Sequence, residues 1–156
     1  MSFWDFLSWL KPPAIKAAVI RPFDTGDMTD TEIVARTIWG EARNQGEQGM
    51  TAVACVIQNR AHQGGWWGNA PRQVCLKPSQ FSCWNAFDPN RAKLLAVTQG
   101  DQQYRTALKL AGGVISGTLS DITNGATSYQ VRGTNAWWSK GQTPVASIGV
   151  HDFYRV

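Results

Sequence analysis

Apolar residues recur at helical spacing in two long segments of this chain. In the first segment, Val34, Thr37 and Ile38 share one face of a helix, and Glu41 continues that face one turn later. The stretch TDTE at 29–32 has the form of a capping box, which marks a helix start. The pattern therefore predicts a helix that begins just after this box and ends before the glycines that follow Glu41.

The second segment has the same period, and a third long helix is indicated by its cap. Residues 47–62 carry a stripe of apolar side chains, made by Met50, Val53, Ala54, Ile57 and Ala61. Asp101 is suited to cap a long helix through residues 102–117. These two segments complete the expected helical frame.

Shorter elements are expected in the rest of the chain. DPNR at 88–91 predicts another helix start, with Asp88 as the cap and Pro89 in the first helical position. Residues 63–87 are rich in Gly, Pro, Trp and Ser, which predicts a structured loop region.

After residue 121 the chain has turn residues and short apolar runs, and 128–131 and 147–156 predict short strands or extended segments. The fold class is therefore mainly α with minor β structure (α+β). We expect a single domain over 29–156, preceded by a lead-in over 1–28.

The first ten residues, MSFWDFLSWL, carry apolar positions at helical spacing. The stretch is too short to span a membrane, and it lacks the basic region and cleavage site of a signal peptide. Two interpretations are open for residues 1–10: a short helix docked on the domain, or a weak membrane contact.

Composition narrows the class of partner. With 156 residues, 43% of them hydrophobic and 17% charged, the chain is long and apolar enough to bury a core. A net charge of +4 favours an anionic polymer, but the absence of a basic run argues against nucleic acid. No Cys/His spacing suggests a metal, and no cofactor is implied.

The cysteines leave one question open. Cys75 and Cys83 are eight positions apart and suit either a disulfide in an oxidising compartment or two reduced thiols. Cys55 falls on the apolar helix face and is expected in the core.

Eight tryptophans and six phenylalanines are many for this length. Such rings fill cores, and they also line carbohydrate grooves, where flat sugar faces stack on them. The pairs Trp66–Trp67 and Trp137–Trp138 are hard to bury completely, because neighbours on a chain seldom share one face.

Glu41 is the main candidate for chemistry. On a buried face at the C-terminal end of a helix, desolvation and the helix dipole both disfavour the ionised carboxylate. A protonated carboxylic acid in a partly apolar cleft can act as the general acid of glycosidic bond cleavage. The alternative is a solvent-facing Glu41 paired with Arg43, and Glu47 is explained by the favourable dipole at the start of the next helix.

Most glycosidases use a second carboxylate, and none of the available ones is singled out by its context: Glu47, Asp88, Asp121 and Asp152. A lytic transglycosylase needs only one acid/base residue, because the substrate's own hydroxyl attacks the anomeric carbon. A single-acid scheme therefore fits the sequence better.

Four blocks of the sequence resemble, in order, the cell-wall hydrolase family typified by the spore cortex-lytic enzyme SleB. They are ARTIWGEARNQGEQGMTAVACVIQNRA (35–61), VCLKPSQFSCWN (74–85), DITNGATSYQV (121–131) and SIGVHDFYR (147–155). The resemblance implies a lysozyme-like, goose-type helical fold and cleavage of the glycan strands of peptidoglycan.

The resemblance also implies site residues. The catalytic acid is the glutamate of the Gly-Glu-Ala-Arg stretch, here Glu41. By likeness to lytic transglycosylases, the other blocks imply the following substrate-binding residues: Gln80, Phe81, Asn124, Gly125, Ala126, Tyr129, His151, Phe153 and Tyr154. Trp84 is a further ring that could stack on a sugar. Each of Gln80, Tyr129 and His151 has a purely structural role as its alternative.

One departure keeps other functions open. Many relatives continue Glu-Ala-Arg with Gly-Glu, where this chain has Asn44-Gln45. The main expectation is a monomeric lytic transglycosylase, a phage or prophage endolysin made in the host cytoplasm and acting in the periplasm on the MurNAc-GlcNAc bond. The alternatives are a hydrolytic muramidase and a non-catalytic peptidoglycan-binding or phage structural protein.

Overall fold

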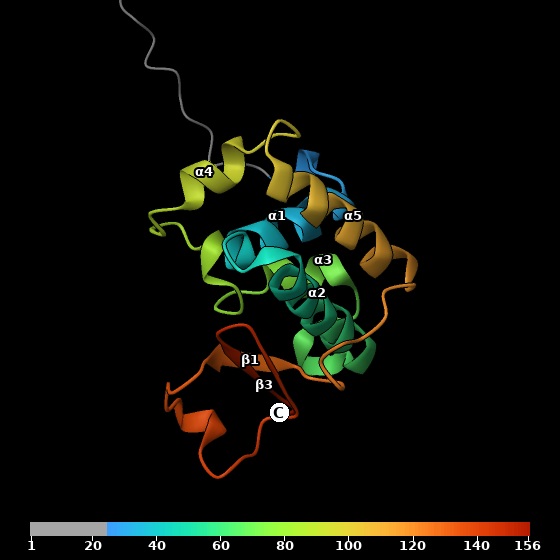
Figure 1. Cartoon of the computed structure of the whole chain (residues 1–156). Coiled ribbons are helices and arrows are strands. Elements are labelled where there is room, and N and C mark those ends of the chain that lie inside the picture. The colour runs from blue at the N-terminus through green and yellow to red at the C-terminus, as the bar shows by residue number, and fades with distance from the viewer. Residues whose placement is uncertain (1–24) are drawn as a thin grey trace, which may run out of the picture.

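The helix that contains Glu41, α1 (Asp30–Ala42), lies at the centre of the molecule (Figure 1). The computed structural model describes residues 25–156. Helices α2 (Gly46–Gln63) and α5 (Gln102–Ser116) pack on α1 and on each other, and the short α3 (Pro71–Leu76) packs against α1 and α2. The remaining helix, α4 (Arg91–Ala96), lies at the end of the helical body farthest from the sheet.

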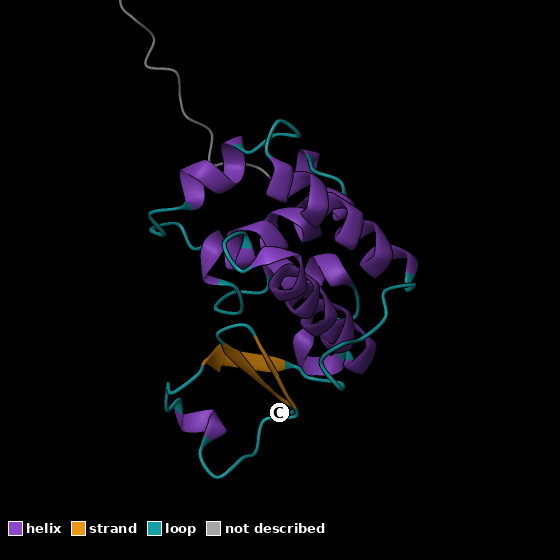
Figure 2. Ribbon diagram, viewed as in Figure 1, coloured by secondary structure: helices purple, strands orange, loops and turns teal. Residues whose placement is uncertain are grey.

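Three short strands form a separate layer beside the helices (Figure 2). They are β1 (Ser128–Val131), β2 (Ala146–Ile148) and β3 (His151–Tyr154). The sheet is antiparallel with the order β1-β3-β2, and Tyr129 pairs with Phe153 in its centre. This mainly helical architecture with a small sheet confirms the expected fold class.

Helix α1 is buried more completely than its sequence pattern predicts. Every residue from Ile33 to Trp39 is buried, so the helix has no solvent face along this stretch. Arg36 is buried too, and its Nη1 donates to the carbonyl oxygens of Leu94 (2.8 Å) and Val97 (3.0 Å). These bonds satisfy Nη1, and the guanidinium also lies over the Tyr104 ring, whereas its Nε has no hydrogen-bond partner among the described residues. The sequence predicted one buried face for this helix, whereas all of its faces are buried between Ile33 and Trp39.

The predicted starts of the long helices are confirmed, whereas the start predicted for the short helix at 88–91 is wrong. Thr29 and Glu32 form the reciprocal capping box, and Asp101 accepts from the Tyr104 amide at 2.8 Å. Helix α4 begins at Arg91 and is preceded by Asn90, so placing Asp88 and Pro89 at its start was wrong. Asp88 instead accepts from the Asn90 amide two residues on, which makes a turn before the helix.

Helix α3 lies inside the region predicted as a loop, where Pro71 occupies its first turn. The short helix and membrane contact expected for residues 1–10 lie outside the described residues. Within 25–156, no helix is long and apolar enough to cross a bilayer.

All three cysteines are buried free thiols, which selects the reduced alternative for Cys75 and Cys83. Burial raises the pKa of the Cys55 thiol to about 11 and that of Cys75 to about 12. Cys55 lies in the core, as expected.

The buried apolar side chains form two clusters. The main one joins α1, α2, α3 and α5, whereas the second, smaller cluster holds the sheet against α2. The second cluster consists of Ala52, Val56, Ala126, Ile148 and Phe153.

Candidate active site

The carboxyl group of Glu41 is held from two distant parts of the chain. Its Oε1 accepts from the backbone N–H of Cys83 at 3.3 Å, and its Oε2 accepts from the Tyr129 hydroxyl at 3.0 Å. Glu41 is half-buried at the end of α1, with Cys83 in the turn Ser82–Trp84 and Tyr129 on β1. The carboxyl group is thus fixed by one donor from the helical body and one from the sheet.

A glycine beside Glu41 allows this approach. A Cβ added to Gly40 would lie 2.8 Å from the Cβ of Cys83 and 3.0 Å from Cδ1 of Leu94. Any larger side chain at this position would push the turn Ser82–Trp84 away from α1 and lengthen the bond from the Cys83 amide. Gly40 is therefore part of the construction of the site.

The neighbours of Glu41 keep their protons near neutral pH. Burial, together with the charge of Glu41 and the hydrogen bond to it, raises the pKa of the Tyr129 phenol well above its ordinary value. The same causes raise the pKa of the Cys83 thiol. Tyr129 therefore acts as a hydrogen-bond donor to Glu41, and neither group competes with it as an acid or base.

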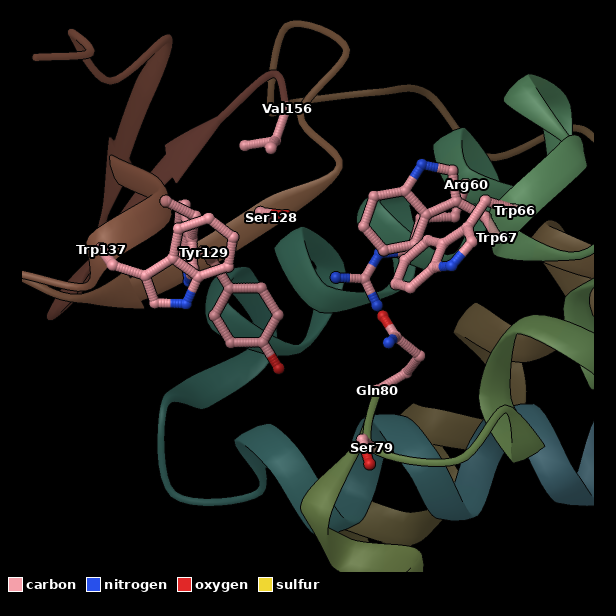
Figure 3. Close-up of a pocket in the computed structure, with 10 residues that line it drawn as sticks. Arg60, Trp66, Trp67, Ser79, Gln80, Ser128, Tyr129, Trp137 and Val156 are labelled. Atoms are coloured by element: carbon pink, nitrogen blue, oxygen red, sulfur yellow. The ribbon is translucent and has the colours of Figure 1, made fainter. Parts of the chain in front are cut away.

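A cleft of about 780 Å³ opens between the helices and the sheet (Figure 3). We call the residues from α2 and the segment after it the helical side: Arg60, Trp66, Trp67, Ser79 and Gln80. The residues of the C-terminal region form the sheet side: Ser128, Tyr129, Trp137, Trp138 and Val156. Because Tyr129 both lines the cleft and contacts Glu41, it connects the acid to the cleft.

The predicted residues of the second block are divided between cleft and core. Gln80 lines the cleft. Phe81 is buried, with its ring beneath the Arg60 guanidinium, and is not among the lining residues. Trp84 donates its Nε1–H to the Thr37 hydroxyl at 2.9 Å, which fixes the turn to α1.

The third block builds the approach to β1. Asn124 adopts a left-handed backbone conformation (φ 56°) and donates from Nδ2 to the Val145 carbonyl. The Gly125 amide donates to Asp121, and Ala126 is buried in the small cluster. These contacts position β1, whereas none of the three residues lines the cleft.

In the closing block, His151 and Tyr154 pack on residues of the cleft. The His151 ring lies edge-on to Tyr129, with 5.4 Å between centroids. Burial lowers the pKa of His151, although the charge of Glu41 opposes the shift. Tyr154 is buried, packs edge-on against Trp138 and accepts from Gln130 Nε2 through its hydroxyl.

No carboxylate side chain is among the residues that line the cleft, and Glu41 adjoins it through its hydrogen bond with Tyr129. Burial of Asp121 opposes its ionisation, but hydrogen bonds from Thr123, Gly125 and Asn59 outweigh this and lower its pKa. Asp152 is held by Ser147 and Arg132. Asp88 caps the turn before α4, and Glu47 is exposed at the start of α2. Among residues 25–156, no cluster of three or more His, Cys, Asp or Glu side chains could hold a metal ion.

Sequence reasoning missed the Cys83 amide and Arg60. A main-chain donor leaves no mark in a sequence pattern. Arg60 did leave one, since it lies three residues after Ile57 and so continues the apolar stripe of α2. The tryptophan pairs, each with one exposed and one half-buried ring, were indicated by their adjacency, and all four rings line the cleft.

Comparisons with known proteins agree with this architecture. A family model described as Cell Wall Hydrolase matches residues 44–154, a range that begins after Glu41. The catalytic domain of the Bacillus cereus SleB protein is similar with a TM-score of 0.62 and 26% identity, over 80% of this chain and 88% of that one. The catalytic domain of the germination-specific lytic transglycosylase SleB from Bacillus anthracis gives 0.61 and 26%, over 80% and 92%. No curated protein sequence matches significantly.

Proposed function

This chain belongs to the cell wall hydrolase family, and from that premise we propose that it is a lytic transglycosylase that cleaves the MurNAc-GlcNAc bond of peptidoglycan. The observation that carries the proposal is the Glu41 carboxyl group, held by Cys83 and Tyr129 beside a cleft that no aspartate or glutamate lines. Hydrolysis by the retaining route needs a second carboxyl group about 5 Å away.

The proposed reaction uses Glu41 twice. As an acid, Glu41 gives its proton to the glycosidic oxygen while the bond from that oxygen to muramic C1 breaks. The resulting carboxylate then takes the proton of the muramic C6 hydroxyl, and O6 bonds to C1 to close a 1,6-anhydro ring. The donors from Cys83 and Tyr129 stabilise the carboxylate between the two steps. No water is consumed, and Glu41 ends protonated as it began.

Mass spectrometry of the soluble products from purified peptidoglycan tests this proposal, with Glu41→Gln and Glu47→Gln in parallel. Glu41→Gln keeps the size of the side chain and removes its transferable proton, so activity should fall by about 10²–10⁴-fold. Glu47→Gln is the matched control, because Glu47 is exposed and lies outside the cleft. We expect anhydro-muramic ends from the wild type and from the control.

Each other outcome has a defined meaning. Reducing ends in place of anhydro ends would replace the transglycosylase with a muramidase. Full activity of Glu41→Gln would remove Glu41 from the reaction. Binding to insoluble peptidoglycan without any soluble product would favour a non-catalytic binding protein.

The proposal includes the endolysin role, in which the enzyme is made in a host cytoplasm and reaches the wall when the inner membrane is opened. Membership of a family that acts on cell walls supports it. Expression in a Gram-negative cytoplasm should cause lysis after chloroform treatment and not before it, and Glu41→Gln should cause none. Lysis without chloroform would contradict this role.

A further inference from the structure

Two cations and three aromatic rings contact one another in series at the helical side of the cleft, with Lys77 and Phe81 outside the lining itself. The Lys77 ammonium lies 4.7 Å from the Trp66 ring centroid, and Trp66 meets Trp67 edge-on at 4.7 Å. The Arg60 guanidinium lies over Trp67 at 4.2 Å and over Phe81 at 5.1 Å. We call these residues the cation–aromatic column: Lys77, Trp66, Trp67, Arg60 and Phe81.

The charge of Arg60 is only partly compensated within the described part of the chain. Its side chain is 6% exposed, and Nε donates to the Thr127 carbonyl, but Nη1 has no hydrogen-bond partner. Both salt bridges seen among residues 25–156 lie elsewhere, Arg72–Asp30 and Arg132–Asp152. Burial lowers the pKa of Arg60 to about 10, so the group is still a cation at neutral pH. A buried, unpaired cation is costly unless an anion reaches it.

The cleft can admit such an anion. None of its ten lining residues is an aspartate or a glutamate. Figure 3 shows the Arg60 guanidinium directed into the cleft between Tyr129 and Gln80, beside the two tryptophan rings. Nε already donates to Thr127 and Nη1 is closed to solvent, which leaves Nη2 as the donor for an incoming carboxylate. A hydrogen bond between two charged groups is stronger than one to a neutral sugar hydroxyl.

The sheet side has different chemistry. Trp137 is 83% exposed, and no charged side chain of this side lines the cleft. A flat, neutral ring suits the face of a sugar, whereas the column opposite suits an acid. The two sides therefore separate a glycan strand from an acidic branch that it carries.

We propose that the cation–aromatic column binds a carboxylate carried on the lactyl branch of the muramic sugar. This inference rests on the proposed function, because that branch is where peptidoglycan carries its acid groups. The carboxylate can come from two sources. In a peptide-bearing strand it belongs to the stem peptide, and in a strand without peptides it is the lactyl carboxylate itself.

Calorimetric binding of three soluble disaccharides to the full chain tests the proposal. The first carries a stem peptide, the second a free lactyl carboxylate, and the third the same lactyl group converted to a neutral amide. We expect the neutral amide to bind about tenfold or more weaker than the tighter of the two acids. Whichever acid binds more tightly identifies the source of the carboxylate. Equal affinity for all three would overturn the proposal.

Variants separate the column from overall charge. Lys77→Gln removes the outer cation and should weaken acid binding about two- to fivefold, without changing amide binding. Lys109→Gln on the exposed face of α5 is the matched control with the same change in net charge, and it should change neither. An equal effect of both substitutions would overturn the proposal, since it would reduce the column to bulk charge.

Arg60→Lys keeps the charge and loses the planar group that contacts the Trp67 and Phe81 rings and donates to Thr127, so acid binding should weaken about tenfold. The Lys77 pair keeps the test decisive if Arg60→Lys fails to fold. Binding can be measured without turnover, so the two proposals can fail separately. If the wild type forms anhydro products but binds acid and amide ligands equally, this inference alone is wrong. If it prefers the acids but forms no products, only the proposed reaction is wrong.

Discussion

The two sides of the cleft are supported by hydrophobic clusters of very different size. The helical side stands on the main cluster, in which α1 is buried all round and Arg60 is fixed between two rings. The sheet side stands on three short strands and a cluster of five buried residues. Yet Glu41 receives one donor from the helical body and one from the sheet. The geometry of the acid therefore depends on the less strongly anchored half as much as on the core.

The largest expected effect comes from loosening the sheet. Phe153 is 1% exposed and occupies the small cluster, so Phe153→Ala should cost about 3–5 kcal/mol. We expect the loss to be local. Hydrogen exchange followed by mass spectrometry should show faster exchange in residues 121–156, while peptides from α1 and α2 stay protected.

Trp137→Ala is the control for this change, because an exposed ring in the same half should alter stability by less than about 0.5 kcal/mol. A uniform rise in exchange across both halves of Phe153→Ala would mean that sheet and helices unfold as one unit. The contrast between the two clusters would then be lost.

The second prediction removes the sheet's hydrogen bond to the acid. Tyr129→Phe keeps the ring and deletes the donor to Glu41 Oε2, a bond to a charged group worth about 1.5–3 kcal/mol. We expect kcat to fall about 10–100-fold with little change in KM, measured by release of soluble glycan fragments.

Tyr154→Phe is the comparison variant on the same sheet. It deletes a hydroxyl that accepts from Gln130 and does not contact Glu41, so its effect on kcat should be smaller. Equal losses in the two variants would show that the hydroxyls act through the stability of the sheet and that the bond to Glu41 has no special part.

The hydrogen bonds of Glu41 show which parts of the molecule the sequence could predict and which it could not. The helices α1, α2 and α5 follow from local period and caps, which depend on residues a few positions apart. The bond between Tyr129 and Glu41 joins residues 88 positions apart, and the Cys83 donor is a main-chain group. Neither leaves a local pattern, so only the resemblance to a family suggested Tyr129, and nothing suggested the Cys83 amide.

The short strands at 128–131 and within 147–156 were predicted correctly, whereas the short helix α3 was missed and the start of α4 was misplaced. Helices α3 and α4 have six residues each, too few to show a period, and their limits are set by what they pack against. Before α4, Asp88 accepts a hydrogen bond from the Asn90 amide in a turn and does not cap the helix. Their sequences fit several local structures, and tertiary contacts decide among them.

A third, smaller effect concerns the helical side. Gly40→Ala would place a Cβ against Cys83 and Leu94, and the overpacking should cost about 1–3 kcal/mol and lower activity by moving the Cys83 amide. Gly112→Ala on α5 is the matched control, since nothing lies within 4 Å of its added Cβ. Alanine there should raise stability by about 0.4–1 kcal/mol.

Urea denaturation of the two variants checks the opposite signs. Destabilisation by both substitutions would mean that glycine serves the helix backbone itself at both positions. A stable and fully active Gly40→Ala would show that the turn Ser82–Trp84 can move without loss of the donor to Glu41.

The smallest expected effect is a pH dependence that originates on the sheet side. The pKa of His151 is lowered in the folded protein, first by burial, while an unfolded histidine has a pKa near 6.5. Below about pH 6.5 the unfolded chain therefore binds a proton that folded His151 does not, so stability falls as the pH falls through this window.

Urea midpoints at pH 7.5, 6.5 and 5.5 should show this loss in the wild type and in His62→Gln, whose histidine is exposed, but a smaller loss in His151→Gln. The aspartates with lowered pKa lose their contribution only near and below pH 4, outside this window. If His151→Gln loses as much stability as the wild type, the sheet side has no titrating group of its own here, and both halves respond to mild acid alike.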